Sequence, residues 1–324
     1  MNREVATPVR VELRPFDPAV DYEPIAELTT TTNVADGVDW ALTSASIQAE
    51  VAPGGYWDPE RDCRVALVDG ERVGFIRVSS KVRDGERVIH RFDVWTRPEW
   101  RRRGVGRTLL AWAEERSRAM QVAGSIGEPG MPNFMSGGVN MAQPEVAAAA
   151  EALGYERIRY SFLMRRPLDL PIDDAPLPDG LEFRSVREAD HRAIFDGNEE
   201  AFEDHWEHAE RTEDDFRILF AEPALDTSLW AVAWDGDQVA GVSMNWIDAE
   251  ENAQLGTNAG WLGSVSVRRP WRKRGVGAAV ITASLRTFKE RGMDDARLGV
   301  DAENPTGALA LYTRLGFTPY QTFG

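Results

Sequence analysis

Alternating apolar and polar positions mark two pairs of short segments, one pair in each half of the chain. A period of two predicts half-buried β-strands, and Asp-Gly between two such runs favours a tight hairpin, because glycine tolerates a positive φ. The pairs are 64–68 with 72–78 around Asp69-Gly70, and 230–234 with 238–242 around Asp235-Gly236. The sequence therefore predicts one β-hairpin in each half.

A basic, glycine-containing run follows each hairpin and precedes a segment with helical periodicity. The runs are Trp100-Arg101-Arg102-Arg103-Gly104-Val105-Gly106 and Trp271-Arg272-Lys273-Arg274-Gly275-Val276-Gly277. The apolar helical faces that follow are Val105, Leu109, Leu110 and Trp112 in the first half, and Val276, Val280, Ile281, Leu285 and Phe288 in the second. A strand, a turn and a helix N-terminus present unpaired N–H groups and the positive end of the helix dipole. Each run therefore predicts an anion site that suits phosphate.

The same landmarks recur in the same order with similar spacing, which indicates an internal repeat. Opening strands around Glu12 and Glu182, the hairpins, the basic runs, and Leu153-Gly154-Tyr155 with Leu315-Gly316-Phe317 all match. Between the copies, residues 167–180 are rich in proline and aspartate, which favours a solvated linker. We expect two α/β domains, 1–166 and 181–324, each an α+β sandwich with a mostly antiparallel, mixed sheet flanked by helices.

Composition narrows the function classes. The 324 residues are 43% hydrophobic and 28% charged, with a net charge of −16 and one cysteine, Cys63. We expect a globular chain without an internal disulfide or a metal site. The acidic balance argues against a nucleic-acid partner, and it is compatible with an amine substrate or simply with solubility. No apolar run reaches about 20 residues, so we expect no membrane partner and a cytoplasmic protein, monomeric or homodimeric.

The second half carries a specific combination of motifs between about residues 261 and 317. It comprises an apolar strand, Arg272-x-x-Gly275-x-Gly277, Asn304, a helix with Ala308 and Leu311-Tyr312, and Leu315-Gly316-Phe317. This combination resembles the GNAT acyltransferase superfamily. The first half matches only at about 92–112 and 153–155. Two such modules in one chain are similar in layout to tandem acetyltransferases of the mycothiol synthase type.

The resemblance implies that acetyl-CoA is the cofactor, held where the sheet splays between the strand ending at Val267 and the strand 297–302. Its pantetheine arm pairs with backbone groups near Val265 and Val267, and Asn304 lies beside it. The residues implied for the pyrophosphate are Arg272, Lys273, Arg274, Gly275, Val276, Gly277 and Ala278. The cofactor-binding residues implied in the first half are Val94, Thr96, Arg101, Arg103, Gly104 and Gly106. The basic cluster with Arg268 and Arg269 is either a contact for the 3′-phosphate or a solvated rim.

The resemblance also implies an N-acetyltransferase in which a primary amine of a small molecule attacks the thioester directly in a ternary complex. Tyr312 is then the general acid near the sulfur, and its ordinary pKa of about 10 suffices to protonate a thiolate. A backbone N–H near Val265 or Val267 holds the oxyanion. Asn304 alternatively caps the helix expected to begin at Pro305.

The general base is not fixed by the motifs. The segment 201–208 lies where members of the superfamily build the acceptor pocket. His205 and Glu203 are candidate bases, Asp204 is a candidate anchor for a cationic amine, and Ser264 is a weaker option. The acceptor itself stays open between a small amine and a peptide or protein amine.

The first half departs from the pattern, because aligning Gly154 with Gly316 puts Ala150 where Tyr312 stands. We expect a degenerate N-terminal domain that holds CoA or serves as scaffold. Residues 156–166 look like two closing strands, for which the second half has no room after Phe317. Either a tail is absent, or the last strand position is filled from elsewhere. The rival interpretation is a non-catalytic acyl-CoA-binding or regulatory protein; Walker and Rossmann nucleotide sites lack their defining residues.

Overall fold

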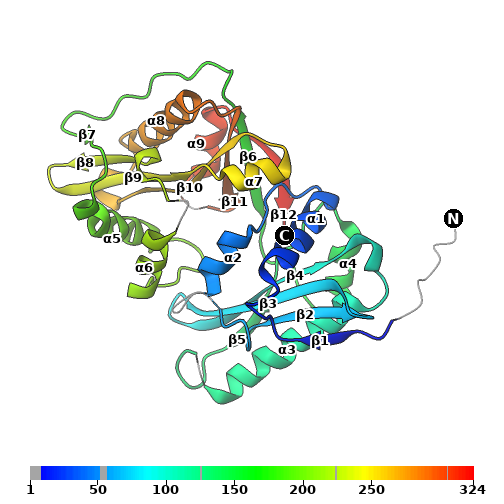
Figure 1. Ribbon diagram of the computed structural model, residues 1–324. Helices are drawn as coiled ribbons and strands as arrows, with labels where there is room; N and C mark the ends of the chain where they lie inside the picture. Colours follow the sequence, from blue (N-terminus) through cyan, green and yellow to red (C-terminus); the bar gives the residue numbers. More distant parts are fainter. Residues whose placement is uncertain (1–8, 52–56, 125, 223–224, 305) are drawn as a thin grey trace. The chain divides into compact units, whose positions relative to one another are not determined.

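The computed structural model describes residues 9–51, 57–124, 126–222, 225–304 and 306–324. The chain forms two compact units (Figure 1), one of residues up to Gly138 with Thr212–Ile218, the other of Val139–Arg211 with Leu219–Gly324. Among the described residues no helix is long and apolar enough to cross a membrane.

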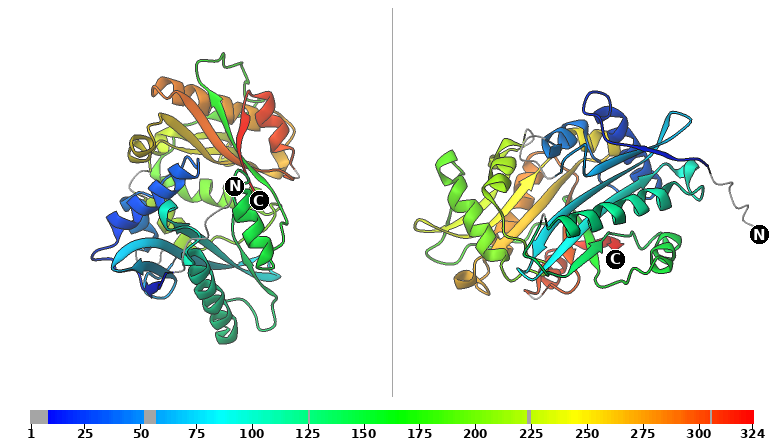
Figure 2. Two further views of the ribbon diagram at one scale, coloured as in Figure 1. Left: turned by 90° about the vertical axis from the view of Figure 1, so that its right-hand side faces the viewer. Right: turned by 90° about the horizontal axis from the view of Figure 1, so that it is seen from below.

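The first unit is built on a five-stranded sheet in sequential order. Its strands are β1 (Glu12–Arg14), β2 (Cys63–Val68), β3 (Glu71–Arg83), β4 (Arg87–Thr96) and β5 (Asn133–Ser136), and its helices are α1 (Tyr22–Ala35), α2 (Ser44–Val51) and α3 (Val105–Ala123). Successive side chains of β2 and β3 enter different cores. Val65 and Phe75 pack under α1 and α2, whereas Ala66 and Ile76 pack under α3, which runs along one face of the sheet (Figure 2).

The second unit is built on a seven-stranded sheet in the order β12-β6-β11-β10-β9-β8-β7. The strands are β6 (Ser161–Pro167), β7 (Glu182–Phe183), β8 (Ala231–Asp235), β9 (Gln238–Trp246), β10 (Ala259–Val267), β11 (Asp295–Asp301) and β12 (Thr318–Phe323). The helices are α4 (Pro144–Ala152), α5 (His191–Phe202), α7 (Ala249–Leu255), α8 (Val276–Glu290) and α9 (Ala308–Arg314), while α6 (Glu213–Ala221) begins in the segment grouped with the first unit. The expected α/β class with two mixed sheets is confirmed.

Both predicted hairpins form, with different turns. Val68 pairs with Glu71 across Asp69-Gly70, and both turn residues have positive φ. In the second hairpin Asp235 pairs with Gln238, so the turn is Gly236-Asp237, one residue later than the Asp-Gly pair suggested. All five residues of the predicted apolar face of α8 are buried.

Strand β6 joins a sheet that the sequence does not assign to it. It lies between β11 and β12 and pairs antiparallel with both, from Ser161 to Pro167 on the β11 side. Met164 is fully buried in the core of the second unit. This strand comes before the expected linker, so the strand position that the second half could not fill is occupied by a segment from the first half. The division falls at Gly138 rather than at residue 166.

The segment 167–180 is consequently not a linker between the units. Leu168 is buried, its N–H donates to the carbonyl of Asp294, and Ile172 and Leu177 pack against the same core. Arg166 donates to the carbonyl of Pro171 at 2.6 Å. The prolines keep the segment extended, and its apolar residues fasten it along the second unit.

Candidate active site

Strands β10 and β11 separate along their length. They pair in parallel only from Ala259–Trp261 to Asp295–Arg297. Beyond this point β10 continues to Val267 against β9, and β11 continues to Asp301 against β6. The facing edges of the two strands thus carry backbone groups without a strand partner in the described chain, which an amide-bearing arm would satisfy.

A β-bulge marks the start of the separation. The register of β10 against β9 shifts between Leu262 and Ser264. A Cβ built on Gly263 would lie 1.7 Å from the ring of Trp246, so only glycine lets this tryptophan cover the bulge. Bulges re-aim the side chains that follow them, and here those are Ser264 and Val265 at the mouth of the split.

The basic run after β10 forms a left-handed turn that opens α8. Lys273 and Gly275 have φ of 61° and 95°. The first helical bond runs from Ala279 N–H to Gly275 C=O. The N–H groups of Val276, Gly277 and Ala278 donate to no group in the described part of the protein. Three unpaired donors at a helix N-terminus have the geometry expected of an anion cradle.

Two of the guanidinium groups near this loop, those of Arg269 and Arg272, bind residues at the end of α5. Arg272 donates to the carbonyls of Val267 and Ala201 at 3.0 Å each, and to Asp204 at 2.8 Å. Arg269 binds the same carboxylate at 2.6 Å. Of the basic cluster, Lys273 and Arg274 are exposed and form no ion pair with a described residue. These two remain available for an anion.

The contacts of Asp204 do not support its interpretation as an amine anchor. The two guanidinium groups that bind its oxygens hold the pKa of this carboxyl well below its ordinary range. Glu203 is exposed and lies 3.3 Å from Arg269. Asp204 instead fastens the segment after α5 to the loop before α8.

The first unit repeats this arrangement. Arg102 and Gly104 have φ of 59° and 96°, within a few degrees of the second loop. Arg101 donates to the carbonyl of Thr96 at 3.2 Å and to Asp36 at 2.6 Å, as Arg272 does to Val267 and Asp204. Strand β4 pairs with β5 only from Val88 to Arg91, so its last residues, Val94 and Thr96 among them, lie beyond the pairing. Arg103 stacks over Trp100 at 5.0 Å.

Tyr312 is buried on α9, 7% exposed, with its ring 5.9 Å from that of Phe317. Its hydroxyl has no hydrogen-bond partner among the described residues. Burial raises the pKa of Tyr312 to about 12, which corrects the expectation of an ordinary value. The phenol is therefore neutral throughout the physiological pH range.

Helix α9 packs closely against the loop that opens α8. A Cβ built on Gly277 would lie 3.2 Å from Leu311, so only a residue without a side chain lets α9 approach this loop so closely.

Asn304 shapes the turn before α9. Its side-chain oxygen accepts hydrogen bonds from the N–H of Thr306 at 2.9 Å and from the hydroxyl of the same residue. The helix begins at Ala308 and not at Pro305, which lies outside the described residues, and Gly307 is its N-cap. Asn304 therefore does not cap the helix as expected.

In the matching turn of the first half, Tyr155 N–H bonds to Ala150 C=O, as Phe317 N–H bonds to Tyr312 C=O. Ala150 thus occupies the position of Tyr312. This repeated pattern of backbone bonds supports the alignment in which the first half has no phenol at the position of Tyr312.

His205 lies near the end of β11. Its Nδ1 is 3.0 Å from the carbonyl of Trp206, and since a carbonyl only accepts, Nδ1 carries the proton and Nε2 is the basic atom. Burial raises the pKa of Asp301, the last residue of β11, but the hydrogen bonds from Arg159, together with smaller contributions of which that of the nearby His205 is the smallest, outweigh this effect and lower it. Arg159 binds Asp301 at 2.7 Å and stacks over Trp206 at 4.6 Å. The segment after α5 therefore spans from the cradle to the far strand of the split.

The sequence reasoning missed Arg159, Asp301 and Asn198. Ser264 donates to the side-chain oxygen of Asn198, which is 1% exposed on α5. A polar residue on the buried face of a helix, one turn after Ile194, was the available signal. Arg159 meets Asp301 only because β6, which follows Arg159, joins the sheet beside β11. The local sequence does not show which sheet β6 joins.

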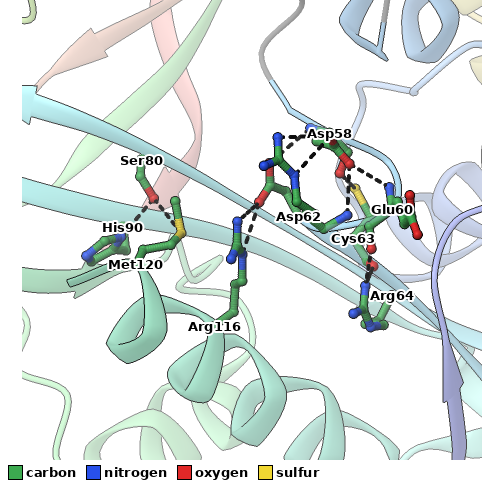
Figure 3. Close-up of polar contacts among 10 residues, drawn as sticks. Asp58, Glu60, Asp62, Cys63, Arg64, Ser80, His90, Arg116 and Met120 are labelled. Carbon is green, nitrogen blue, oxygen red and sulfur yellow. Dashed lines mark hydrogen bonds and ion pairs between the residues drawn. The ribbon is translucent and has the colours of Figure 1, made fainter. Parts of the chain in front are cut away.

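The polar and sulfur side chains of the first unit shown in Figure 3 are structural. Cys63 is fully buried, and burial raises the pKa of its thiol, so it is a poor nucleophile. His90 lies 2.7 Å from Ser80 and 2.8 Å from Asn133, and burial lowers its pKa. The ring is a neutral link between β3 and β5.

A sheet split beside unpaired N–H groups at a helix N-terminus is the arrangement that the resemblance implies for an acyl-CoA-dependent acyltransferase. A sequence model of the acetyltransferase (GNAT) family matches residues 38–128 and 191–317. The chain belongs to this family, whose acetyl donor is acetyl-CoA, and is an N-acetyltransferase. The resemblance stated above and the tandem architecture are confirmed.

Similar proteins cover nearly the whole chain. The mycothiol acetyltransferase of Geodermatophilus obscurus is 30% identical over 319 residues, covering 97% of this chain and 96% of that protein. The mycothiol acetyltransferase of Thermobispora bispora is 30% identical, covering 96% of each. A GCN5-related N-acetyltransferase from Sphaerobacter thermophilus has a TM-score of 0.74 at 25% identity, covering 98% of this chain and 95% of that one. A tandem GNAT protein from the clavulanic acid biosynthesis pathway shares the fold, with a TM-score of 0.67, 19% identity and 97% coverage of each.

Proposed function

We propose that the protein transfers the acetyl group of acetyl-CoA to a primary amine of a small molecule, at the split between β10 and β11. The observation that carries the proposal is the juxtaposition of an unpaired strand edge, three unpaired N–H groups and a buried phenol in one unit. The first unit repeats the loop, but the residue that matches the phenol in the repeat is Ala150 of α4, which belongs to the second unit. The relatives named mycothiol acetyltransferases favour a metabolite acceptor of that kind.

The cradle and the split fit the coenzyme. Val276, Gly277 and Ala278 would donate to its pyrophosphate, and the exposed Lys273 and Arg274 add positive charge. The edge of β10 at Val265 and Val267 would pair with its amides. Asn304 lies between β11 and α9, beside this path. When bound, the coenzyme supplies a thioester as the acyl donor.

The amine attacks the thioester carbon directly. Nε2 of His205 takes the proton that the amine loses, and a backbone N–H at Val265 holds the oxygen on which charge develops. Tyr312 gives its proton to the departing sulfur. A free thiol has a pKa of about 8.5, well below that of this phenol. The burial that raises the pKa of Tyr312 also raises that of a thiolate formed beside it, so proton transfer stays feasible in the dry split.

The first unit is proposed to bind CoA without turning it over. The nearly equal backbone angles of the two loops support retained anion binding. The residue that matches Tyr312 in the repeat is Ala150 of the second unit, which offers no proton. A chain that bound CoA in both units and acetylated no amine would instead be a binding or regulatory protein.

The test is thiol release from acetyl-CoA with a panel of small amines and peptides. Tyr312→Phe is expected to lower kcat by about 10²–10⁴-fold, the range for a lost general acid. Tyr22→Phe, which changes a partly buried tyrosine of the first unit, is the matched control. An unchanged kcat in Tyr312→Phe would refute the assignment of Tyr312 as the general acid. Turnover of peptides but of no small amine would refute the proposal that the acceptor is a metabolite.

A further inference from the structure

A buried polar pair on the α5 side of the split has no role in the steps above. The hydroxyl of Ser264, on β10 just after the bulge, donates to the side-chain oxygen of Asn198 at 2.9 Å. Asn198 is 1% exposed, and its Nδ2 has no hydrogen-bond partner among the described residues. A buried donor left unpaired costs roughly 1–3 kcal/mol, so such groups in native proteins call for an explanation.

The strand register places this pair opposite the phenol. Ser264 pairs with Met244 of β9, which belongs to the apolar cluster under α5. Val265 is the next residue and packs against the cluster that contains Tyr312. Because successive side chains of a strand point to opposite faces, Ser264 and Tyr312 lie on opposite faces of the sheet. The face of Ser264 is also the face of α5, which leads into His205, the proposed base. An acceptor amine directed at Nε2 of His205 would therefore approach from the side of α5.

The polarity of the pair defines what it would bind. Ser264 uses its proton on Asn198, which leaves the lone pairs of its oxygen free to accept. Asn198 uses its carbonyl oxygen and keeps both amide protons to donate. The pair therefore presents an acceptor and a donor side by side. A hydroxyl or a secondary amide, which donates and accepts at once, matches both.

We infer that Asn198 and Ser264 form a subsite that binds a hydroxyl or amide group next to the reacting amine of the acceptor. This inference rests on the proposed acetyl transfer and specifies its acceptor. An alkylamine without such a group leaves Nδ2 of Asn198 unpaired, so it gains less from binding.

The experiment compares kcat/KM for 2-aminoethanol and for glycinamide with kcat/KM for propylamine, at saturating acetyl-CoA. Ser264→Ala removes the accepting oxygen, and Asn198→Asp replaces the donor by a second acceptor. Each is expected to lower the ratio of the polar amine to propylamine by about 3- to 10-fold, the effect of one neutral hydrogen bond. The amine pKa values cancel in this comparison, because each acceptor is compared with itself between variants. Preference for 2-aminoethanol or for glycinamide tells which polar group the subsite takes.

Ser266→Ala is the matched control, since Ser266 pairs with Val242 on the same face of β10 but bonds to neither member of the pair. Its ratio is expected to equal that of the wild type. Ratios that Ser264→Ala and Asn198→Asp leave unchanged, in an enzyme that acetylates these amines, would overturn the subsite alone. Equal losses for propylamine and the polar amines would also overturn it, because they indicate a structural effect. A wild type that acetylates no amine would overturn the proposed function together with the subsite.

Discussion

Gly275→Ala and Gly104→Ala are a matched pair of perturbations, one in each unit. Both glycines precede a helix with nearly the same backbone, φ 95° for Gly275 and 96° for Gly104. Nothing lies within 4 Å of a Cβ built at either position. Alanine therefore meets the strain of the left-handed region without a clash, at about 1–2 kcal/mol. The two variants are expected to lose similar free energies of unfolding.

The two variants are expected to differ in activity. In Gly275→Ala the strained residue displaces the N–H groups of Val276, Gly277 and Ala278 from the proposed pyrophosphate site. A hydrogen bond to a charged group contributes about 1.5–3 kcal/mol, and 1.4 kcal/mol is tenfold in affinity. Loss of one such bond raises the KM for acetyl-CoA about tenfold or more. Gly104→Ala is expected to leave this KM unchanged, because acetyl transfer is proposed to take place in the second unit and this variant alters only the loop of the first unit.

The assay is thiol release against acetyl-CoA concentration at saturating amine, with urea denaturation of both variants in parallel. Equal rises in KM at equal losses of stability would refute the assignment of turnover to the second unit. A KM unchanged in both variants would refute the pyrophosphate site itself.

Three further predictions concern the phenol, the carboxylate pairs and the inserted strand. Because burial raises the pKa of Tyr312 to about 12, folding favours the neutral phenol; urea denaturation should show the wild type losing stability relative to Tyr312→Phe as the pH rises from about 10, the unfolded value, toward 12. Asp204→Asn should raise the KM for the amine severalfold, because it loses the ion pairs with Arg269 and Arg272 that fasten the segment after α5, and Asp204→Glu should restore this KM. Asp36→Asn, which breaks the matching ion pair in the first unit, should leave the KM for the amine unchanged. Equal effects of Asp204→Asn and Asp36→Asn would contradict a role of Asp204 in positioning the acceptor segment. Met164→Ala should destabilise the second unit by about 2–5 kcal/mol, seen as faster hydrogen exchange in β11 but not in β3; faster exchange in β3 alone would place β6 with the first unit.

The repeated local motifs were readable from the sequence because their signals are short-range. Asp69-Gly70 fixes a turn by its own backbone preference, and Gly104 and Gly275 fix the left-handed loops in the same way. The apolar face of α8 follows from a period that needs no partner. These signals placed the strand, loop and helix of each unit correctly.

The remaining features depend on contacts between distant residues. Ser161–Pro167 alternates as any edge or central strand does, so its sequence gives no reason to prefer one sheet over the other. The charge of Asp204 fits an amine as well as the guanidinium groups of Arg269 and Arg272. The pKa of Tyr312 depends on burial by the residues around it. In each case a tertiary contact decides between interpretations that the local sequence leaves equal.

A crystal structure with bound CoA tests the central claim most directly. The account predicts the pantetheine arm between β10 and β11, the pyrophosphate on the N–H groups of Val276, Gly277 and Ala278, and the hydroxyl of Tyr312 within hydrogen-bond distance of the sulfur. Coenzyme bound only at the loop of Gly104, or a sulfur lying away from Tyr312, would contradict it.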